Sequence, residues 1–237
     1  MEWTDDAILL SARRHGETSV VANLLTRAHG RHAGLVHGGM GKAARAALQA
    51  GNLLQVTWKA RLSEHLGVFT WELSRAFGSV WLHDPLRLAG LSAACAMVEV
   101  CLPEREAHMA VYDGLAEVIF ALNDEEWPSL YVRWELGLLG ELGYRLDLSC
   151  CAASGTTEGL SFVSPRSGRA VSLAAGTPYR DKLLVLPAFL LDETAGDRPA
   201  VIEGLALTGY FIERHVLAQD GKGLPAARSR LVDRLRA

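Results

Sequence analysis

The sequence predicts an α+β protein in which an N-terminal five-stranded OB-fold barrel is followed by an α-helical bundle domain with a degenerate, metal-free zinc-ribbon-like insertion. Three observations lead to this prediction. Residues 1–80 contain five short runs rich in β-branched and aromatic side chains. The period of the apolar residues becomes 3.6 after Pro85, and residues 148–178 are rich in glycine and serine. We therefore expect a domain at 1–80 and a helical domain at 81–237, interrupted by 148–178.

The expected strands lie between turn-forming residues in the first 80 positions. They are "AILLSARR" (7–14), "SVVANLLTR" (19–27), "HAGLVHG" (32–38), "LLQVTWKAR" (53–61) and "GVFTWEL" (67–73). Between the third and fourth runs, residues 38–52 read as glycines followed by an alanine-rich basic helix. Five strands with such an excursion are typical of an OB-fold, and an SH3-like barrel is the close alternative.

Helices are expected at six places in the rest of the chain. The patterns cover 84–103, 104–124, 128–144, 186–193, 199–219 and 225–237. The first of them begins with Asp84-Pro85, a typical helix start, and the third begins with Pro128-Ser129. We find no internal repeat and no low-complexity tract.

The insertion has the outline of a zinc ribbon but lacks its ligands. Cys151-Ala-Ala-Ser154-Gly155 matches one zinc knuckle and Ser172-Leu-Ala-Ala175-Gly176 matches the second, whereas a structural zinc site needs four thiolate or imidazole ligands. Cys150 adds one thiol, and no histidine lies between His108 and His215. Serine hydroxyls are poor zinc ligands, so we expect no metal, and a scaffold held by hydrogen bonds and apolar side chains.

Composition points to a cytoplasmic globular protein without a membrane segment. The chain has 237 residues, of which 49% are hydrophobic, but its apolar runs are too short to cross a bilayer and the N-terminus "MEWTDDAILL" is acidic. The four cysteines do not form a disulfide framework. Residues 1–80 hold nine Lys and Arg against six Asp and Glu, and the remainder holds fifteen against twenty-one. The basic excess therefore lies in the barrel, as expected for a module that binds a polyanion.

Motifs for enzymatic chemistry are missing from the sequence. "HGGMGKA" lacks the glycine and the hydroxyl residue that a phosphate loop requires, since Val36 and Ala43 stand at those positions. There is no nucleophile elbow and no His-x-x-x-His pair. We expect no catalytic residue, no cofactor and no enzymatic activity.

Cationic side chains recur at the strand ends and turns of the expected barrel. They are Arg13, Arg14, Arg27, Arg31, Lys42, Arg45, Lys59 and Arg61. OB-folds bind single strands by neutralising phosphates and stacking bases on aromatic rings. Only Trp58, Phe69 and Trp71 are candidates for stacking, and strand alternation places some of them in the core. We therefore expect DNA binding that is dominated by the backbone, insensitive to sequence and sensitive to salt.

Several stretches resemble the RecO family of bacterial recombination mediators. They are "GGMGKAARAALQAGNLLQV", "YVRWELGLLGELGYRLDLSCCAASG", "FVSPRSGRAVS", "YRDKLLVLPAFLL" and "FIERHVLAQDGKGLPAARSRLV". The second stretch is the most specific, because its helix leads through Leu-Gly-Tyr into the cysteine motif. The order of barrel, helical domain and ribbon also resembles that family. The sequence departs from the family pattern at the zinc site, where many members carry two Cys-x-x-Cys pairs and only Cys151 remains here.

The resemblance implies a function without bond-breaking chemistry. Members bind single- and double-stranded DNA, anneal complementary strands, associate with RecR, and help RecA load onto DNA coated by the single-stranded-DNA-binding protein, whose acidic C-terminal tail they capture. A receptor for that tail should pair a cation with an apolar groove. The candidates are Arg133, Tyr131, Trp134 and Arg145. Two alternatives stay open: an adaptor whose barrel contacts RecR rather than DNA, and an RNA-binding OB-fold factor.

Overall fold

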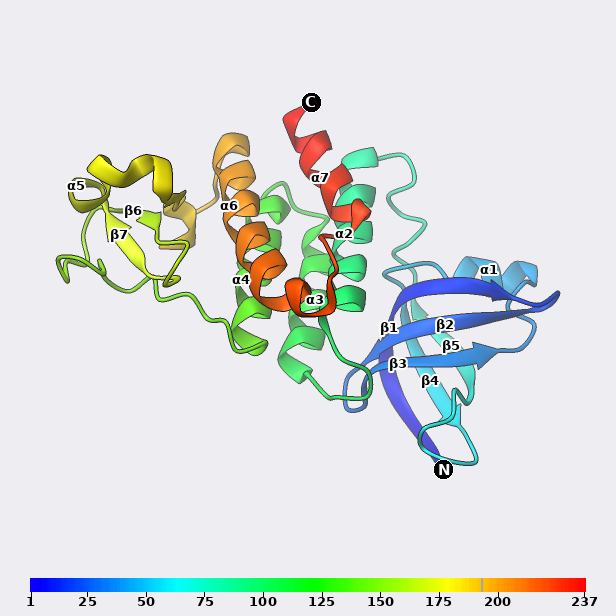
Figure 1. Cartoon of the computed structure of the whole chain (residues 1–237). Coiled ribbons are helices and arrows are strands. Elements are labelled where there is room, and N and C mark those ends of the chain that lie inside the picture. Colours follow the sequence, from blue (N-terminus) through cyan, green and yellow to red (C-terminus); the bar gives the residue numbers. More distant parts are fainter. Residues whose placement is uncertain (193) are drawn as a thin grey trace. The chain divides into compact units, whose positions relative to one another are not determined.

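The computed structural model describes residues 1–192 and 194–237, which form two compact units. The first unit comprises Met1–Leu122 with Pro225–Leu231, and the second comprises Asn123–Leu224 with Val232–Ala237. Figure 1 shows the strands of the first unit in blue and cyan and the small sheet of the second in yellow. The expected domain boundary near residue 80 lies within the first compact unit.

The first unit contains a closed five-stranded barrel, which confirms the predicted OB-fold. Its strands are β1 (Glu2–His15), β2 (Ser19–Thr26), β3 (Gly30–Val36), β4 (Leu53–Lys59) and β5 (Val68–Arg75). They are ordered β1-β2-β3-β5-β4, and β4 pairs back with β1. The only parallel contact in this barrel joins β3 to β5 at Leu35 and Val68. Helix α1 (Lys42–Ala47) lies between β3 and β4, in the excursion that the sequence indicated.

Strand β1 closes the barrel because it pairs with two partners. Its first half runs antiparallel to β4, from Glu2 opposite Lys59 to Ile8 opposite Leu53. Its second half runs antiparallel to β2 and ends with His15 opposite Ser19. The register shifts between Leu9 and Ser11, as at a β-bulge, which bends the strand from one partner to the next.

The barrel core is filled by alternating side chains from all five strands. Leu9, Leu24, Leu54 and Val56 are at most 1% exposed. Trp58 is also buried, and its indole Nε1 donates a hydrogen bond to the carbonyl oxygen of Leu66 at 3.0 Å. This bond satisfies the one polar atom of the largest ring in the core.

Two helices follow the barrel in the first unit. Helix α2 (Pro85–Cys101) is capped by Asp84, whose carboxylate accepts hydrogen bonds from the amides of Leu86 and Arg87. Helix α3 spans Met109–Ala121. The expected helix at 104–124 is therefore wrong in its first turn. Residues 104–108 are not helical, because Glu104 bridges to Arg31 of β3 and the Arg105 amide donates to the Arg31 carbonyl at 2.8 Å.

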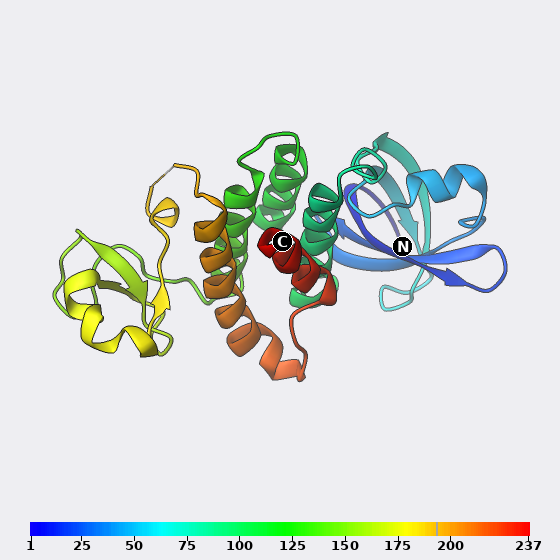
Figure 2. The same ribbon diagram turned by 90° about the horizontal axis from the view of Figure 1, so that it is seen from above.

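The two longest helices of the second unit are α4 (Trp127–Glu141) and α6 (Arg198–Phe211), which pack against each other (Figure 2). Asp197 caps α6 by accepting a hydrogen bond from the Ala200 amide. A π-helical turn, Ile212–Leu217, continues α6. The last helix, α7 (Ala226–Arg236), spans the boundary of the two units in sequence. Within 1–192 and 194–237, no helix is long and apolar enough to cross a membrane.

The expected insertion at 148–178 contains two strands of a small sheet, and a third strand follows it, in the order β7-β6-β8. The strands are β6 (Leu160–Val163), β7 (Ala170–Ser172) and β8 (Leu184–Val185), and a short helix, α5 (Leu173–Gly176), follows β7. Strand β8 was not expected from the sequence. The helix expected at 186–193 is wrong as well: the structure has one 3₁₀ turn at Ala188–Leu190, directly after β8, and Glu193 lies outside the described residues.

Candidate nucleic-acid interface

The eight cationic residues selected from the sequence fall into two groups in the barrel. His15 at the end of β1 lies opposite Ser19 of β2, and Val36 at the end of β3 lies opposite Val20 of β2, so these strand ends share one end of the barrel. Arg13, Arg14, Lys42 and Arg45 belong to this end, which we call the hairpin end. Arg27, Arg31, Lys59 and Arg61 belong to the other end, which we call the N-terminal end.

The hairpin end carries the cations that are least neutralised. Lys42 and Arg45 are exposed on α1, and neither has a carboxylate within ion-pair distance among the described residues. The amide of Met40 donates to the Thr18 carbonyl at 3.1 Å, which ties the loop before α1 to the β1–β2 turn. Arg14 is exposed near that turn and donates only to the Gly16 carbonyl, at 3.0 Å. Three available cations therefore lie on joined segments.

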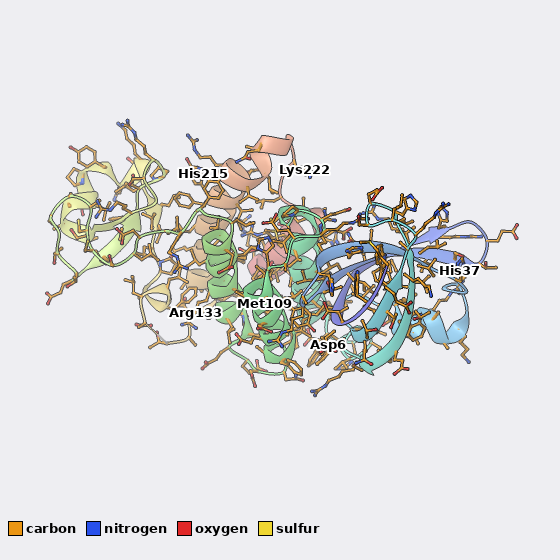
Figure 3. The ribbon with its side chains drawn as sticks, turned by 90° about the horizontal axis from the view of Figure 1, so that it is seen from below. Asp6, His37, Met109, Arg133, His215 and Lys222 are labelled. Carbon is orange, nitrogen blue, oxygen red and sulfur yellow. The ribbon has the colours of Figure 1, made fainter. Side chains whose placement is uncertain are left out.

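The hairpin end also carries imidazoles that the selection of cations omitted. His15 ends β1 and His37 follows β3, and both side chains are exposed. Figure 3 labels His37 at this end of the barrel. Neither residue was among the candidate site residues selected from the sequence. Two histidines next to a basic turn were the sequence signal that could have added them to the candidate site.

At the N-terminal end, the structure pairs most of the cations with carboxylates. Arg27 makes a two-point contact with Asp113 of α3, with both N···O distances at 3.1 Å, and this contact raises the pKa of Arg27. Arg31 donates to the carbonyl of Leu102 at 2.9 Å and pairs with Glu104, and its side chain is only 15% exposed. Lys59 pairs with Glu2 at 3.1 Å. Arg61 is exposed and has no such partner among the described residues.

Arg13 at the hairpin end is only partly neutralised, because the carboxylate that it contacts also accepts hydrogen bonds from two polar side chains. The Oε1 atom of Glu99 in α2 accepts hydrogen bonds from Ser11 Oγ at 2.9 Å, Asn23 Nδ2 at 3.0 Å and Arg13 at 3.2 Å. The Arg13 side chain is nevertheless 80% exposed, against 21% for Glu99. Glu99 therefore fixes the cation in place and offsets its charge.

Few aromatic rings of the barrel are available for stacking. Trp58 and Phe69 are each 2% exposed, and Trp3 and Trp71 are partly buried against the same core. His32 lies with these rings, with its ring centroid 4.8 Å from that of Trp58. Burial lowers the pKa of His32 to about 4, so this imidazole is neutral at physiological pH. The barrel thus offers cations rather than aromatic faces.

The residues predicted to bind a partner's tail do not form one exposed groove. Tyr131 is fully buried and Trp134 is 7% exposed, so both rings are part of the core of the second unit. Arg133, labelled in Figure 3, donates to the carbonyl oxygens of Phe189, Asp192 and Thr194. Its guanidinium lies 5.5 Å from the centre of the Phe189 ring. Arg145 is exposed and lines a separate cavity, whose described lining does not include the other three residues.

The sequence matches known protein families along nearly the whole chain. The N-terminal family described as "Recombination protein O N terminal" matches residues 1–77, and the one described as "Recombination protein O C terminal" matches residues 82–223. The chain belongs to the RecO family. It is 56% identical to the DNA repair protein RecO of Rhodospirillum centenum, covering 100% of this chain and 95% of that protein. It is 52% identical to the RecO of Rhodospirillum rubrum, and the match covers 100% of this chain and 97% of that protein. It is 47% identical to a RecO of Cereibacter sphaeroides, and the match covers 99% of this chain and 98% of that protein.

In this RecO chain, the two halves of the degenerate cysteine motif meet. The Cys151 sulfur accepts a hydrogen bond from the Ser172 amide at 3.2 Å, and Ser172 Oγ accepts one from the Ala175 amide at 3.4 Å. Hydrogen bonds from Ser154 and Ser172 lower the pKa of the Cys151 thiol to about 6, although the residue is 1% exposed. The described residues contain no group of three or more His, Cys, Asp and Glu side chains that could hold a metal ion. Cys151 and Ser172, which stand at zinc-ligand positions of the motif, are joined to each other by a hydrogen bond.

Proposed function

We propose that this RecO-family protein is a non-enzymatic, DNA-binding recombination mediator of DNA repair, which holds single strands at the hairpin end of its barrel. Family membership over the full chain supports the repair role. The observation that carries the proposed site is the group of exposed cations without carboxylate partners, Arg14, Lys42 and Arg45. By contrast, Arg27, Arg31 and Lys59 at the N-terminal end are occupied by Asp113, Glu104 and Glu2.

The geometry favours annealing over sequence-specific recognition. Cations on joined loops neutralise phosphates of a strand, while the buried rings of Trp58 and Phe69 leave its bases unstacked. A strand held by its backbone keeps its base edges available to a complementary strand. Reduced repulsion between the two polyanions and free base edges are the two physical requirements of annealing. Neither requirement calls for a catalytic residue or a cofactor.

The experiment compares two double variants with the same loss of charge. Lys42→Ala with Arg45→Ala removes cations of the hairpin end, and Lys59→Ala with Arg61→Ala removes cations of the N-terminal end. We expect the first to reduce the salt slope for single-stranded DNA, measured by fluorescence anisotropy, by about 1.4, because each lost phosphate contact is worth about 0.7. The second should change the slope little. Equal slopes for wild type and the first variant would contradict the proposed site.

The same measurement separates the alternative functions. No binding of single-stranded DNA at low salt would favour an adaptor whose barrel contacts RecR instead. Tighter binding of structured RNA than of single-stranded DNA would favour an RNA-binding factor.

We also propose RecR and the C-terminal tail of the single-stranded-DNA-binding protein as partners, with Arg133 as the contact for the tail. The guanidinium of Arg133 is partly exposed and so offers a cation to a carboxylate, whereas the Phe189 ring beside it is 2% exposed and belongs to the core. A bound tail would replace some of the carbonyl oxygens that Arg133 now contacts. We expect Arg133→Ala to weaken binding of an acidic peptide with a free carboxylate by about tenfold, since a charged hydrogen bond is worth about 1.5–3 kcal/mol. Equal affinity of wild type and variant would refute this assignment.

A further inference from the structure

A cavity in the second unit lies where the chain leaves α4 and meets the β6–β7 turn. It has a volume of about 210 Å³ and is lined by Tyr144, Arg145, Leu146, Arg166, Ser167, Gly168, Phe211 and His215. All of these residues belong to the second unit. Its described lining includes no residue of the barrel and none of the residues that Arg133 contacts.

Backbone hydrogen bonds hold the two sides of the cavity together. The Asp147 amide donates to the Gly168 carbonyl at 3.0 Å, and the Ala170 amide donates to the Asp147 carbonyl at 2.8 Å. Gly168 has a positive φ of 67°, and a Cβ at that position would lie 3.0 Å from the Leu146 side chain. The segment carrying Arg145 is therefore fixed beside the turn that carries Arg166.

The charge in the cavity is cationic. Arg145 and Arg166 are exposed, and neither has a carboxylate partner among the described residues. The nearby Asp147 is paired with Arg169 at 3.1 Å and also accepts a hydrogen bond from Ser149. None of the described lining residues is acidic. The lining therefore offers two guanidinium groups and one hydroxyl, which are donors of the kind that bind the oxygens of a phosphate group.

One wall of the cavity is a stack of three rings. The His215 ring lies 5.1 Å from Tyr144 and 5.9 Å from Phe211 between ring centroids, with interplanar angles of 29° and 12°. Phe211 is buried, so the half-buried Tyr144 is the solvent end of the stack. The side chain of Gln219 fixes this ring by donating to the Tyr144 hydroxyl at 2.7 Å. A flat ring at the end of a rigid stack is a surface on which a base can lie.

The backbone that positions His215 is itself unusual. His215 lies in the π-helical turn Ile212–Leu217 at the end of α6, and Figure 3 labels it there. Such turns are rare and are frequently found at functional sites. This observation is independent of the two arginines.

We propose that this cavity binds a phosphate group of a nucleic-acid strand, with Arg145 and Arg166 as its ligands and Tyr144 as the stacking surface for the adjacent base. The phosphate is either an internal diester or the monoester of a strand end. The inference does not depend on DNA binding by the barrel, because every residue it uses belongs to the second unit. It gives the protein a second strand-binding site, apart from the hairpin end.

The test follows the imidazole signals of His215 in the full chain by NMR, with His215→Gln to assign them. The probes are thymidine dinucleotides with and without a 5′-phosphate. We expect saturable shifts of the His215 signals. Arg145→Ala with Arg166→Ala should weaken the affinity about tenfold or more. The control Arg180→Ala removes an exposed arginine from the turn Thr177–Lys182 of the same unit and should leave the affinity unchanged.

The outcomes identify the source of the phosphate or overturn the proposal. Tighter binding of the phosphorylated dinucleotide indicates a strand end, and equal binding indicates an internal diester. No shift with either probe, or the same affinity in the double variant while the indole signal of the buried Trp134 shows an intact fold, overturns the proposal. It is also overturned if an acidic peptide with a free carboxylate shifts His215 at lower concentration than the dinucleotides do. Lys42→Ala with Arg45→Ala should leave the His215 shifts intact, so failure at the barrel stays distinguishable from failure here.

Discussion

Glu99→Gln should strengthen the binding of single-stranded DNA. The Glu99 carboxylate lies 3.2 Å from Arg13 and offsets its charge, while Ser11 and Asn23 hold that carboxylate in place. Glutamine retains a carbonyl oxygen that accepts a hydrogen bond but carries no charge. The variant therefore turns a neutralised cation of the hairpin end into an available one.

The size of the effect follows from counterion release. One additional phosphate contact steepens the salt slope for a single strand by about 0.7, which corresponds to about eightfold tighter binding at roughly 50 mM salt and about fourfold at roughly 150 mM. The cost in stability is about 1–2 kcal/mol, because three hydrogen bonds to the Glu99 oxygen lose the assistance of its charge and the one from exposed Arg13 contributes little. Arg13 is already 80% exposed, so no rearrangement is needed for it to reach a phosphate.

The assay is fluorescence anisotropy of a labelled single-stranded oligonucleotide over a series of salt concentrations. Asp113→Asn is the matched control, because it also removes one negative charge and releases a cation, Arg27, but at the N-terminal end. We expect a steeper slope for Glu99→Gln and an unchanged one for Asp113→Asn. Equal increases in both variants would mean that net charge alone matters. No change in Glu99→Gln would refute the role of Arg13 in the hairpin end.

Two further predictions concern stability and thiol chemistry. Asp84→Ala should lower the free energy of unfolding by about 1–2 kcal/mol, because α2 loses its cap and Arg87 its partner at 2.8 Å. Hydrogen bonds from Arg87 lower the pKa of Asp84, so this contribution is complete at neutral pH and is lost as the pH falls from about 4 through the lowered pKa. Urea unfolding at neutral and acidic pH checks it, and a difference between wild type and variant that does not shrink in acid would contradict it. Ser172→Ala should raise the pKa of the Cys151 thiol above its value of about 6. The side chain and the backbone amide of Ser172 both donate hydrogen bonds to the sulfur, and the substitution removes the one from the side chain. The pH dependence of alkylation in a Cys150→Ser background measures this, and an unchanged midpoint would show that Ser172 does not stabilise the thiolate.

Local sequence patterns were sufficient to predict most of the fold. The alternation of "SVVANLLT" and the 3.6-residue period after Pro85 indicated β2 and α2, because each pattern reflects one buried face. The failure at residues 104–108 has a different origin. Their composition favours a helix, but the edge of β3 takes up the Arg105 amide through the carbonyl of Arg31. No local pattern contains that pairing, since it joins residues 74 positions apart in the sequence.

The candidate site illustrates the same limit in electrostatic terms. The sequence identifies eight cations in the barrel, but their availability depends on carboxylates supplied by later helices. Arg13 meets Glu99 and Arg27 meets Asp113, in both cases 86 residues further along the chain. A single signal for one of these partners was present: Glu99 is the one acidic residue in the apolar segment that forms α2, and a carboxylate in such a position requires a hydrogen-bonding partner. Arg14, Lys42 and Arg45 have no ion-pair partner among the described residues, because they lie on the turn and the short helix at the hairpin end, where no described carboxylate reaches them. The position of the acidic residues, more than the number of basic ones, therefore decides which end of the barrel keeps cations without an ion pair among the described residues.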